Sequence, residues 1–149
     1  MAAKSVEILL VEDNIHDERL TIKALQKNNL TNKLHVVRDG EEALEFLFHT
    51  GRYKKDETSQ EIDPPRLILL DLKLPKIDGL ELLNIIKKDE RTKTIPVVIL
   101  TSSTQESDML QSYRLGVNSY IVKPVEFDKF ISAVSDLGLY WMILNELPK

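Results

Sequence analysis

The chain has 149 residues, of which 42% are hydrophobic and 30% are charged, a composition typical of one soluble globular domain. Its net charge of −4 at pH 7 comes without a basic stripe that could neutralise phosphates, which argues against nucleic acid as the main partner. It contains no cysteine, which excludes disulfides, thiolate metal sites and thiol catalysis and fits a reducing cytoplasm. No apolar run is long enough to span a bilayer. We therefore expect a single cytoplasmic domain over residues 1–149.

Strand-like and helix-like segments alternate along the chain. Five short apolar runs predict strands, and each is followed by the apolar periodicity of a helix. The predicted strands are 6–11, 34–37, 67–70, 96–100 and 119–122. The predicted helices run from about 14 to 29, 39 to 48, 78 to 89 and 103 to 115, and a long last helix from about 126 to 144. Capping spacing marks three helix starts, at the pairs Asn14 with Asp17, Asp39 with Glu42 and Ser103 with Glu106.

This alternation predicts an α/β fold. The continuous apolar run at 67–70 is typical of a strand buried on both faces of a parallel sheet. Connections between parallel strands are right-handed in nearly all proteins. We therefore expect a flavodoxin-like (βα)5 fold, a doubly wound five-stranded parallel sheet of order 2-1-3-4-5 with helices on both faces.

Two segments depart from the regular pattern. Residues 50–66 have no periodicity and contain Pro64 and Pro65, which makes them either a solvated insertion or an interaction element.

The last helix is apolar all round near its end, and one sheet face cannot bury so many apolar residues. An exposed apolar patch usually marks an interface. We therefore predict a homodimer through the fourth helix, fifth strand and fifth helix, with Phe130, Tyr140 and Trp141 as candidate contacts. The apolar residues of the fourth helix, Met109, Tyr113 and Leu115, could form a partner face or pack inside the domain, and most of them are interpreted as packing residues.

Polar residues follow four of the predicted strands. The first strand ends in Glu12 and Asp13, the third in Asp71, the fourth in Thr101 and the fifth in Lys123. Because the carboxyl ends of parallel strands share one edge of the sheet, where such folds place their chemistry, we expect these side chains to converge.

Convergent carboxylates repel one another unless a cation lies between them. Oxygen ligands without thiolate or histidine suit a hard divalent ion, first of all Mg²⁺, and His16, His35 and His49 show no ligand spacing and are interpreted as surface or loop residues. A metal held beside a free carboxylate oxygen favours phosphoryl transfer onto that carboxylate. A lysine and a hydroxyl nearby can bind the phosphoryl oxygens.

The chain resembles the response-regulator receiver domains of the CheY type. The resemblance rests on Glu12-Asp13, on the segment 71–75 (Asp-Leu-Lys-Leu-Pro) with Gly79, on Thr101-Ser102 and on Lys123-Pro124, in that order along the chain. It covers nearly all of the chain.

The resemblance implies a role for each of these residues. Asp71 would be the phosphoacceptor, and Glu12, Asp13 and Asp71 would bind Mg²⁺ together with the backbone carbonyl of Lys73. Thr101 and Lys123 would hold the phosphoryl oxygens. Tyr120 matches the aromatic switch position, although a tyrosine in a short strand is often just half-buried. Pro124 would follow a cis peptide bond.

The function implied is that of a single-domain response regulator. It would take its phosphoryl group from a sensor histidine kinase and signal by protein contact, without turning over a separate substrate as an enzyme does. The segment 72–76, the long loop, Tyr140-Trp141 and Pro148 also resemble the small response regulators of cyanobacterial phytochromes. The kinase would then be a phytochrome that carries the bilin chromophore itself.

Other functions on the same fold fit the residues less well. A phosphorylation-independent interaction module is the main alternative, but the full set of polar residues argues against it. A flavodoxin would not place Glu12-Asp13 beside a flavin phosphate. A haloacid-dehalogenase-like phosphatase needs a second aspartate where Ile15 stands.

Overall fold

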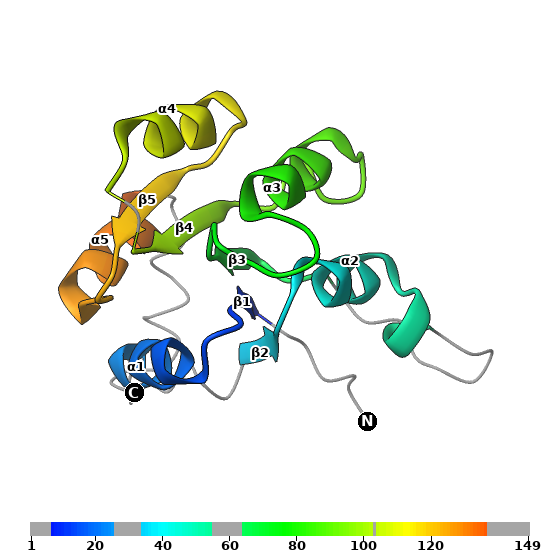
Figure 1. Cartoon of the computed structure of the whole chain (residues 1–149), viewed down its shortest axis with the longest axis horizontal. Coiled ribbons are helices and arrows are strands. Elements are labelled where there is room, and N and C mark those ends of the chain that lie inside the picture. The colour runs from blue at the N-terminus through cyan, green and yellow to red at the C-terminus, as the bar shows by residue number, and fades with distance from the viewer. Residues whose placement is uncertain (1–6, 26–33, 55–63, 103, 137–149) are drawn as a thin grey trace, which may run out of the picture.

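The computed structural model describes residues 7–25, 34–54, 64–102 and 104–136. Five parallel strands form one sheet in the order β2-β1-β3-β4-β5, with helices between them (Figure 1). The strands are β1 (Ile8–Val11), β2 (Leu34–Val37), β3 (Leu67–Leu70), β4 (Val97–Thr101) and β5 (Ser119–Val122). The helices are α1 (Ile15–Leu25), α2 (Gly40–Phe48), the short 3-10 helix η3 (Gly51–Tyr53), α3 (Gly79–Lys88), α4 (Glu106–Arg114) and α5 (Phe127–Asp136). The predicted fold class and strand order are confirmed.

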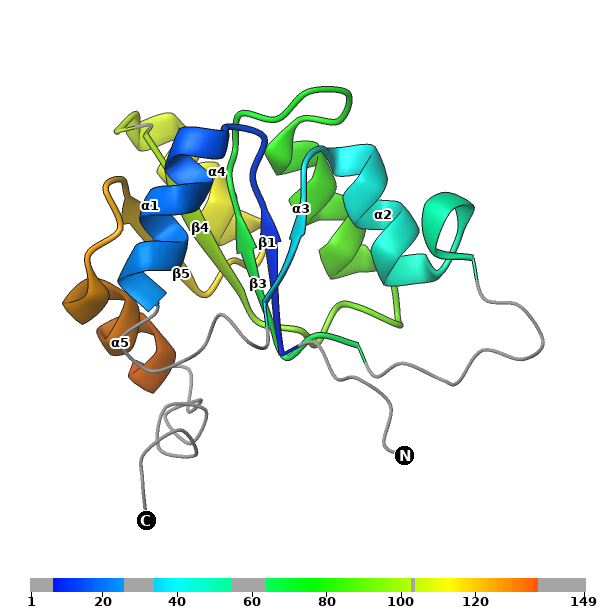
Figure 2. The ribbon, with the colours of Figure 1, turned by 90° about the horizontal axis from the view of Figure 1, so that it is seen from below.

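The sheet has a hydrophobic core on each face. α1 and α5 cover one face and α2, α3 and α4 the other (Figures 1 and 2). Alternate residues of each strand point to opposite faces, so Leu69 packs in the α1/α5 core and Ile68 and Leu70 in the α2/α3 core. All four residues of β3 are buried, as predicted for the run 67–70, and the same holds for all four residues of β1, its neighbour in the middle of the parallel sheet.

Side-chain caps fix the beginnings of three helices. The backbone N–H of Asp17 donates to Asn14 Oδ1 over 2.9 Å, and that of Glu42 donates to Asp39 Oδ1 over 2.7 Å. Asp78 caps α3 by accepting from Leu80 N–H. The predicted cap of α4 differs, because Gln105 occupies the position and makes no side-chain cap. Ser103 lies outside the described residues.

A close backbone approach sets the turn after β3. The N–H of Gly79 donates to the carbonyl of Leu72 over 2.9 Å. A Cβ at Gly79 would collide with the backbone of Asp71 and Leu72, so only glycine lets α3 begin this close to the strand end. The loops that follow β1 and β3 lie at the same edge of the sheet (Figure 2).

The structure corrects three sequence-based interpretations. Phe130, predicted as a dimer contact, is 1% exposed and packs in the α1/α5 core, because its side of α5 faces the sheet. Tyr113, one of the fourth-helix residues interpreted mostly as packing residues, is 48% exposed, which favours the alternative of a partner face for this residue. His35 is a half-buried residue of β2 that stacks on Phe46 with ring centroids 4.5 Å apart.

Some predictions fall beyond the part of the chain that the structure describes. α5 is described as far as Asp136, so the predicted extension of this helix, with Tyr140 and Trp141, lies outside the described residues. Among the helices that are described, none is both long enough and apolar enough to cross a membrane.

Candidate functional site

Three carboxylates meet where β1 and β3 end. Glu12 continues the β1–β2 pairing through its N–H to Val37 O, 3.0 Å, and Asp71 continues the β3–β1 pairing through its N–H to Val11 O, 3.1 Å. Strand pairing therefore fixes both backbones. Carboxylate oxygens of Glu12, Asp13 and Asp71 all lie within 4.8 Å of one another. Glu12 is only 1% exposed and Asp71 is buried, whereas Asp13 is exposed.

Lys123 reaches this cluster from the end of β5. Its Nζ donates to Glu12 Oε1 over 2.6 Å, to Asp71 Oδ2 over 2.9 Å and to Asp17 Oδ2 over 2.9 Å. Its N–H donates to the carbonyl of Thr101 over 2.8 Å, which aligns the ends of β4 and β5. The peptide bond between Lys123 and Pro124 is cis. The predicted lysine thus contacts the predicted carboxylates directly.

The electrostatics of the cluster follow from burial and these contacts. Burial raises the pKa of Glu12 to about 7, even though the hydrogen bond from Lys123 lowers it, and the charge of Asp71 adds to the rise. Burial would lower the pKa of the Lys123 ammonium, but its hydrogen bonds to Glu12, Asp71 and Asp17 raise it above its ordinary value. The lysine therefore stays charged and shares its charge among the carboxylates.

The other predicted residues lie near this edge of the sheet or inside the neighbouring strand β5. Thr101 is fully buried at the end of β4. Tyr120 is half-buried, pairs with Ile99 in the sheet and packs against the α2/α3 core. Lys73 has an exposed side chain, and its N–H donates to Asp71 Oδ1 over 3.2 Å. Both oxygens of Asp71 thus accept a hydrogen bond, one from a backbone N–H and one from Lys123.

Asp17 belongs to the site, although its place in the sequence predicts only a role in a helix cap. Its N–H closes the first turn of α1 on Asn14, while its carboxylate accepts from Lys123. One feature of the sequence could have assigned Asp17 to the site, namely its position in the first helical turn after β1. That turn lies over the edge of the sheet where β1 ends.

The residues present fit a hard divalent cation. The clustered donor atoms of Glu12, Asp13 and Asp71 are all oxygens, the ligand type that Mg²⁺ and similar ions prefer. The buried Glu12 carboxylate, whose pKa is raised to about 7, would be stabilised in its charged form by a nearby cation. Chemically, the arrangement brings a carboxylate nucleophile, an ammonium group and a set of oxygen donors for a metal to one place.

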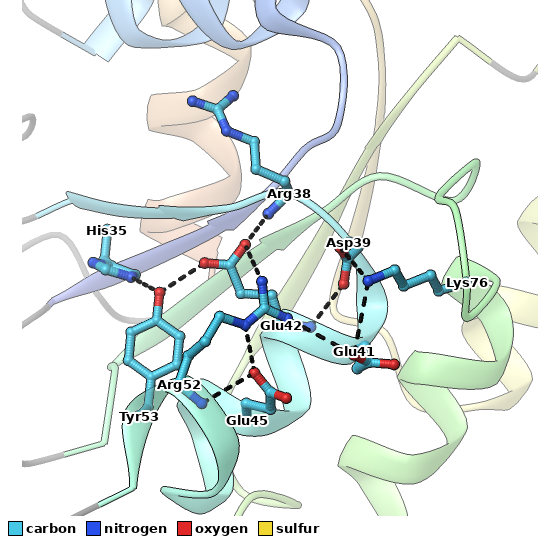
Figure 3. Close-up of polar contacts among 9 residues, drawn as sticks. All are labelled: His35, Arg38, Asp39, Glu41, Glu42, Glu45, Arg52, Tyr53 and Lys76. Carbon is cyan, nitrogen blue, oxygen red and sulfur yellow. Dashed lines mark hydrogen bonds and ion pairs between the residues drawn. The ribbon is translucent and has the colours of Figure 1, made fainter.

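A polar network holds the segment that follows α2 (Figure 3). Tyr53 of η3 donates to Glu42 Oε2 over 2.7 Å and lies 3.0 Å from His35 Nε2. Arg52 Nε donates to Glu45 Oε1 over 2.6 Å. Burial and the hydrogen bond to Glu42 raise the pKa of Tyr53 to about 12. The start of the predicted 50–66 loop is thus packed against α2. Residues 55–63 lie outside the described part of the chain. A role for this loop in interactions stays a prediction.

The pKa of Glu12 predicts how the metal-free protein responds to pH. Its value in the folded state, about 7, lies above the ordinary 4.5, so the folded state keeps a proton that the unfolded state releases. The free energy of unfolding should therefore fall as pH rises from about 4.5 to about 7, by on the order of 2 kcal/mol from this group. Glu12→Gln should remove this part of the fall.

Urea unfolding in EDTA at about pH 5 and about pH 7.5 measures the effect. The matched control is Glu90→Gln, because Glu90 lies in the turn beyond the end of α3 and its side chain is 84% exposed. This variant should keep the pH dependence of the parent protein. An identical pH dependence in Glu12→Gln and the parent protein would contradict the raised pKa.

Comparisons with known proteins agree with this geometry. A family model described as the response regulator receiver domain matches residues 8–135. The probable methanogenesis regulatory protein FilR2 of Methanothrix harundinacea is 40% identical over 142 residues, 95% of this chain and 86% of its own length. Response regulator Rcp1 of Synechocystis is 40% identical over 141 residues, 95% of this chain and 92% of its own.

Solved structures give the same result. The bacteriophytochrome response regulator RtBRR is 49% identical, with a TM-score of 0.79 over 99% of this chain and 85% of its own. The Mn²⁺-bound form of Rcp1 has a TM-score of 0.73 at 39% identity, over 99% of this chain and 100% of its own. The matches cover the sheet and every strand end that carries a site residue, and they show that this chain belongs to the response regulator receiver family.

Proposed function

We propose that the protein is a response regulator that accepts a phosphoryl group on Asp71 from a phosphohistidine of a sensor kinase. The observation that carries this proposal is the 2.9 Å contact of Lys123 Nζ with Asp71 Oδ2, beside Glu12 and Asp13. An Asp71 oxygen forms a bond to phosphorus while the phosphorus–nitrogen bond of the donor breaks, and the imidazole leaves with that electron pair. Lys123 then faces the new phosphoryl oxygens.

We propose Mg²⁺ as the cofactor, held by Glu12, Asp13, Asp71 and the backbone carbonyl of Lys73. The all-oxygen cluster and the likeness to the Mn²⁺-bound form of Rcp1 support a divalent ion at this place. When bound, Mg²⁺ would offset the charge of the carboxylates and of the incoming phosphoryl group. The chain's own residues orient the acceptor, since the Lys73 N–H and the Lys123 ammonium each hold one oxygen of Asp71.

We propose that Thr101 and Tyr120 carry the signal away from the site. Thr101 lies at the end of β4, next to the Lys123 backbone, and its hydroxyl would bind a phosphoryl oxygen. Tyr120 is one of the half-buried residues of β5, so part of its ring can still become buried when Thr101 moves. Both residues would then bias the surface of α4 and β5 toward a second state.

The proposed kinase is a phytochrome, which the likeness to RtBRR supports.

The proposed output is protein contact, including a homodimer through α4, β5 and α5. Leu110 and Tyr113 support this interface, because they are 51% and 48% exposed and lie three residues apart on one side of α4. We further propose that the protein works in the cytoplasm and turns over no separate substrate.

Asp71→Asn should remove phosphorylation while leaving the fold intact, because the amide keeps the size of the carboxylate but is a far poorer nucleophile. Incubation with acetyl phosphate and Mg²⁺ should add one phosphoryl group to the parent protein, measured by intact mass, and none to Asp71→Asn.

Asp89→Asn at the far end of α3 serves as the control and should be phosphorylated. Phosphate retained in Asp71→Asn would show that another residue is the acceptor. No phosphorylation of the parent protein, together with no binding of beryllofluoride, would favour the phosphorylation-independent module.

A bacteriophytochrome histidine kinase should transfer phosphate to this chain faster than a chemotaxis-type histidine kinase does. The physical reason is that phosphoryl transfer requires the exposed surface of this chain to be complementary to the surface of the kinase that donates the phosphoryl group. Both kinases are first autophosphorylated with labelled ATP, and the transfer rates are compared at equal concentrations. Equal rates, or faster transfer from the chemotaxis-type kinase, would contradict the proposed partner.

The double variant Leu110→Ser/Tyr113→Ser should weaken self-association, because it removes two exposed apolar side chains from the proposed interface. Light scattering coupled to size exclusion measures the molecular mass at high concentration. Leu20→Ser is the matched control, since Leu20 is also exposed but lies on α1, which is not part of the proposed interface. A parent protein that stays monomeric with and without beryllofluoride would rule out the homodimer.

A further inference from the structure

The Lys123 ammonium has no N–H left for a further ligand. A lysine ammonium carries three N–H donors, and here they go to Glu12 Oε1, Asp17 Oδ2 and Asp71 Oδ2 at 2.6, 2.9 and 2.9 Å. A phosphoryl group on Asp71 brings several new acceptor oxygens to the same ammonium. Lys123 can bind them only by giving up at least one of its present carboxylate partners.

We propose that Asp17 is a positioning residue that holds Lys123 in the unphosphorylated protein and competes with the phosphoryl group for it. Asp17 would thereby set how tightly the site takes a phosphoryl group. This inference rests on the proposed function, because it assigns a regulating residue to that same site.

The turn between β1 and α1 aims Asp17 at the lysine. Asn14 accepts from the Asp17 N–H over 2.9 Å, and the Asn14 N–H donates to Glu12 Oε2 over 3.2 Å. The first turn of α1 is therefore tied to the end of β1 by side-chain hydrogen bonds at both positions. Asp17 reaches Lys123 across 106 residues of sequence, and this contact places α1 over the same site as β5.

Asp17 is the partner best able to release the lysine. Glu12 has a side chain that is 1% exposed, whereas that of Asp17 is 28% exposed. Asp17 also borders a pocket of about 270 Å³, lined in addition by His16, Leu20, Thr21, Lys123, Pro124 and Val125. The carboxylate can turn into this pocket and regain water, so separating it from Lys123 costs less than separating the buried Glu12. Asp71 stays beside the lysine because it carries the phosphoryl group itself.

Charge acts in the same direction as competition. A phosphoryl group carries about −1.5 to −2 charges near neutral pH, and Asp17 adds another negative charge at the same ammonium. Replacing Asp17 with a neutral residue of the same size should therefore favour an anion on Asp71 for two reasons. It frees one N–H of Lys123, and it removes the repulsion between the Asp17 carboxylate and the anion.

The test is the affinity for beryllofluoride, a phosphoryl mimic, measured by fluorine NMR at saturating Mg²⁺. Asp17→Asn should bind it roughly three- to tenfold more tightly than the parent protein, the range expected from removing one partly exposed charge next to the site. Asp17→Glu should restore the competing carboxylate and bind close to the parent affinity. Glu90→Gln removes a distant charge of the same sign, and its affinity should not change.

The direction of the change separates a positioning role from structural damage. A damaged site would bind beryllofluoride more weakly, so tighter binding by Asp17→Asn supports the proposal, and equal or weaker binding overturns it. Urea unfolding confirms that the variant is folded, and Asp17→Ser provides a second neutral variant if it is not. A parent protein that binds no beryllofluoride at saturating Mg²⁺ would instead overturn the proposed function.

Discussion

The contact between one ammonium group and several carboxylates is the interaction on which this site depends. Glu12 and Asp71 are buried at the ends of adjacent strands, and two buried carboxylates at this spacing would repel each other strongly without a cation. Lys123 supplies that cation from the protein itself. A buried charge cluster of this kind is costly to keep as a purely structural device, because each ion loses its water. Its presence at an edge where strands end is therefore better explained by chemistry than by stability.

The fold brings the cluster together through strand pairing. Four residues of the site directly follow or end a strand, and hydrogen bonds to the neighbouring strand fix their backbones: Glu12, Asp71, Thr101 and Lys123. Gly79 adds a close contact that holds α3 against the turn after Asp71. The side chains are thus positioned by rigid parts of the molecule, the arrangement best suited to holding reacting groups in place.

Much of this could be predicted from the sequence, for reasons that the structure makes plain. The apolar run at 67–70 identified a strand buried on both faces, and the order of strands and helices determined the topology and hence the shared position of Glu12, Asp13, Asp71, Thr101 and Lys123. Asp17 was not predicted because its capping position already gave a sufficient local explanation. Its partner Lys123 comes 106 residues later, and apolar periodicity carries no information on such a contact. Phe130 was misplaced for a related reason, since periodicity shows that a helix has an apolar side but not which apolar residues remain for a second surface.

The separation of Lys123 and Glu12 by 111 residues has a consequence for how the charge cluster assembles. β5 pairs with β4 alone among the described strands, and it follows the other four described strands along the chain. The carboxylates of β1 and β3 can be close together in a nascent chain that still lacks their lysine. Contacts between such distant parts of a chain form late, because they require the longest loops to close. The complete charge cluster, and with it the proposed site for a phosphoryl group, would thus form only when β5 joins the sheet.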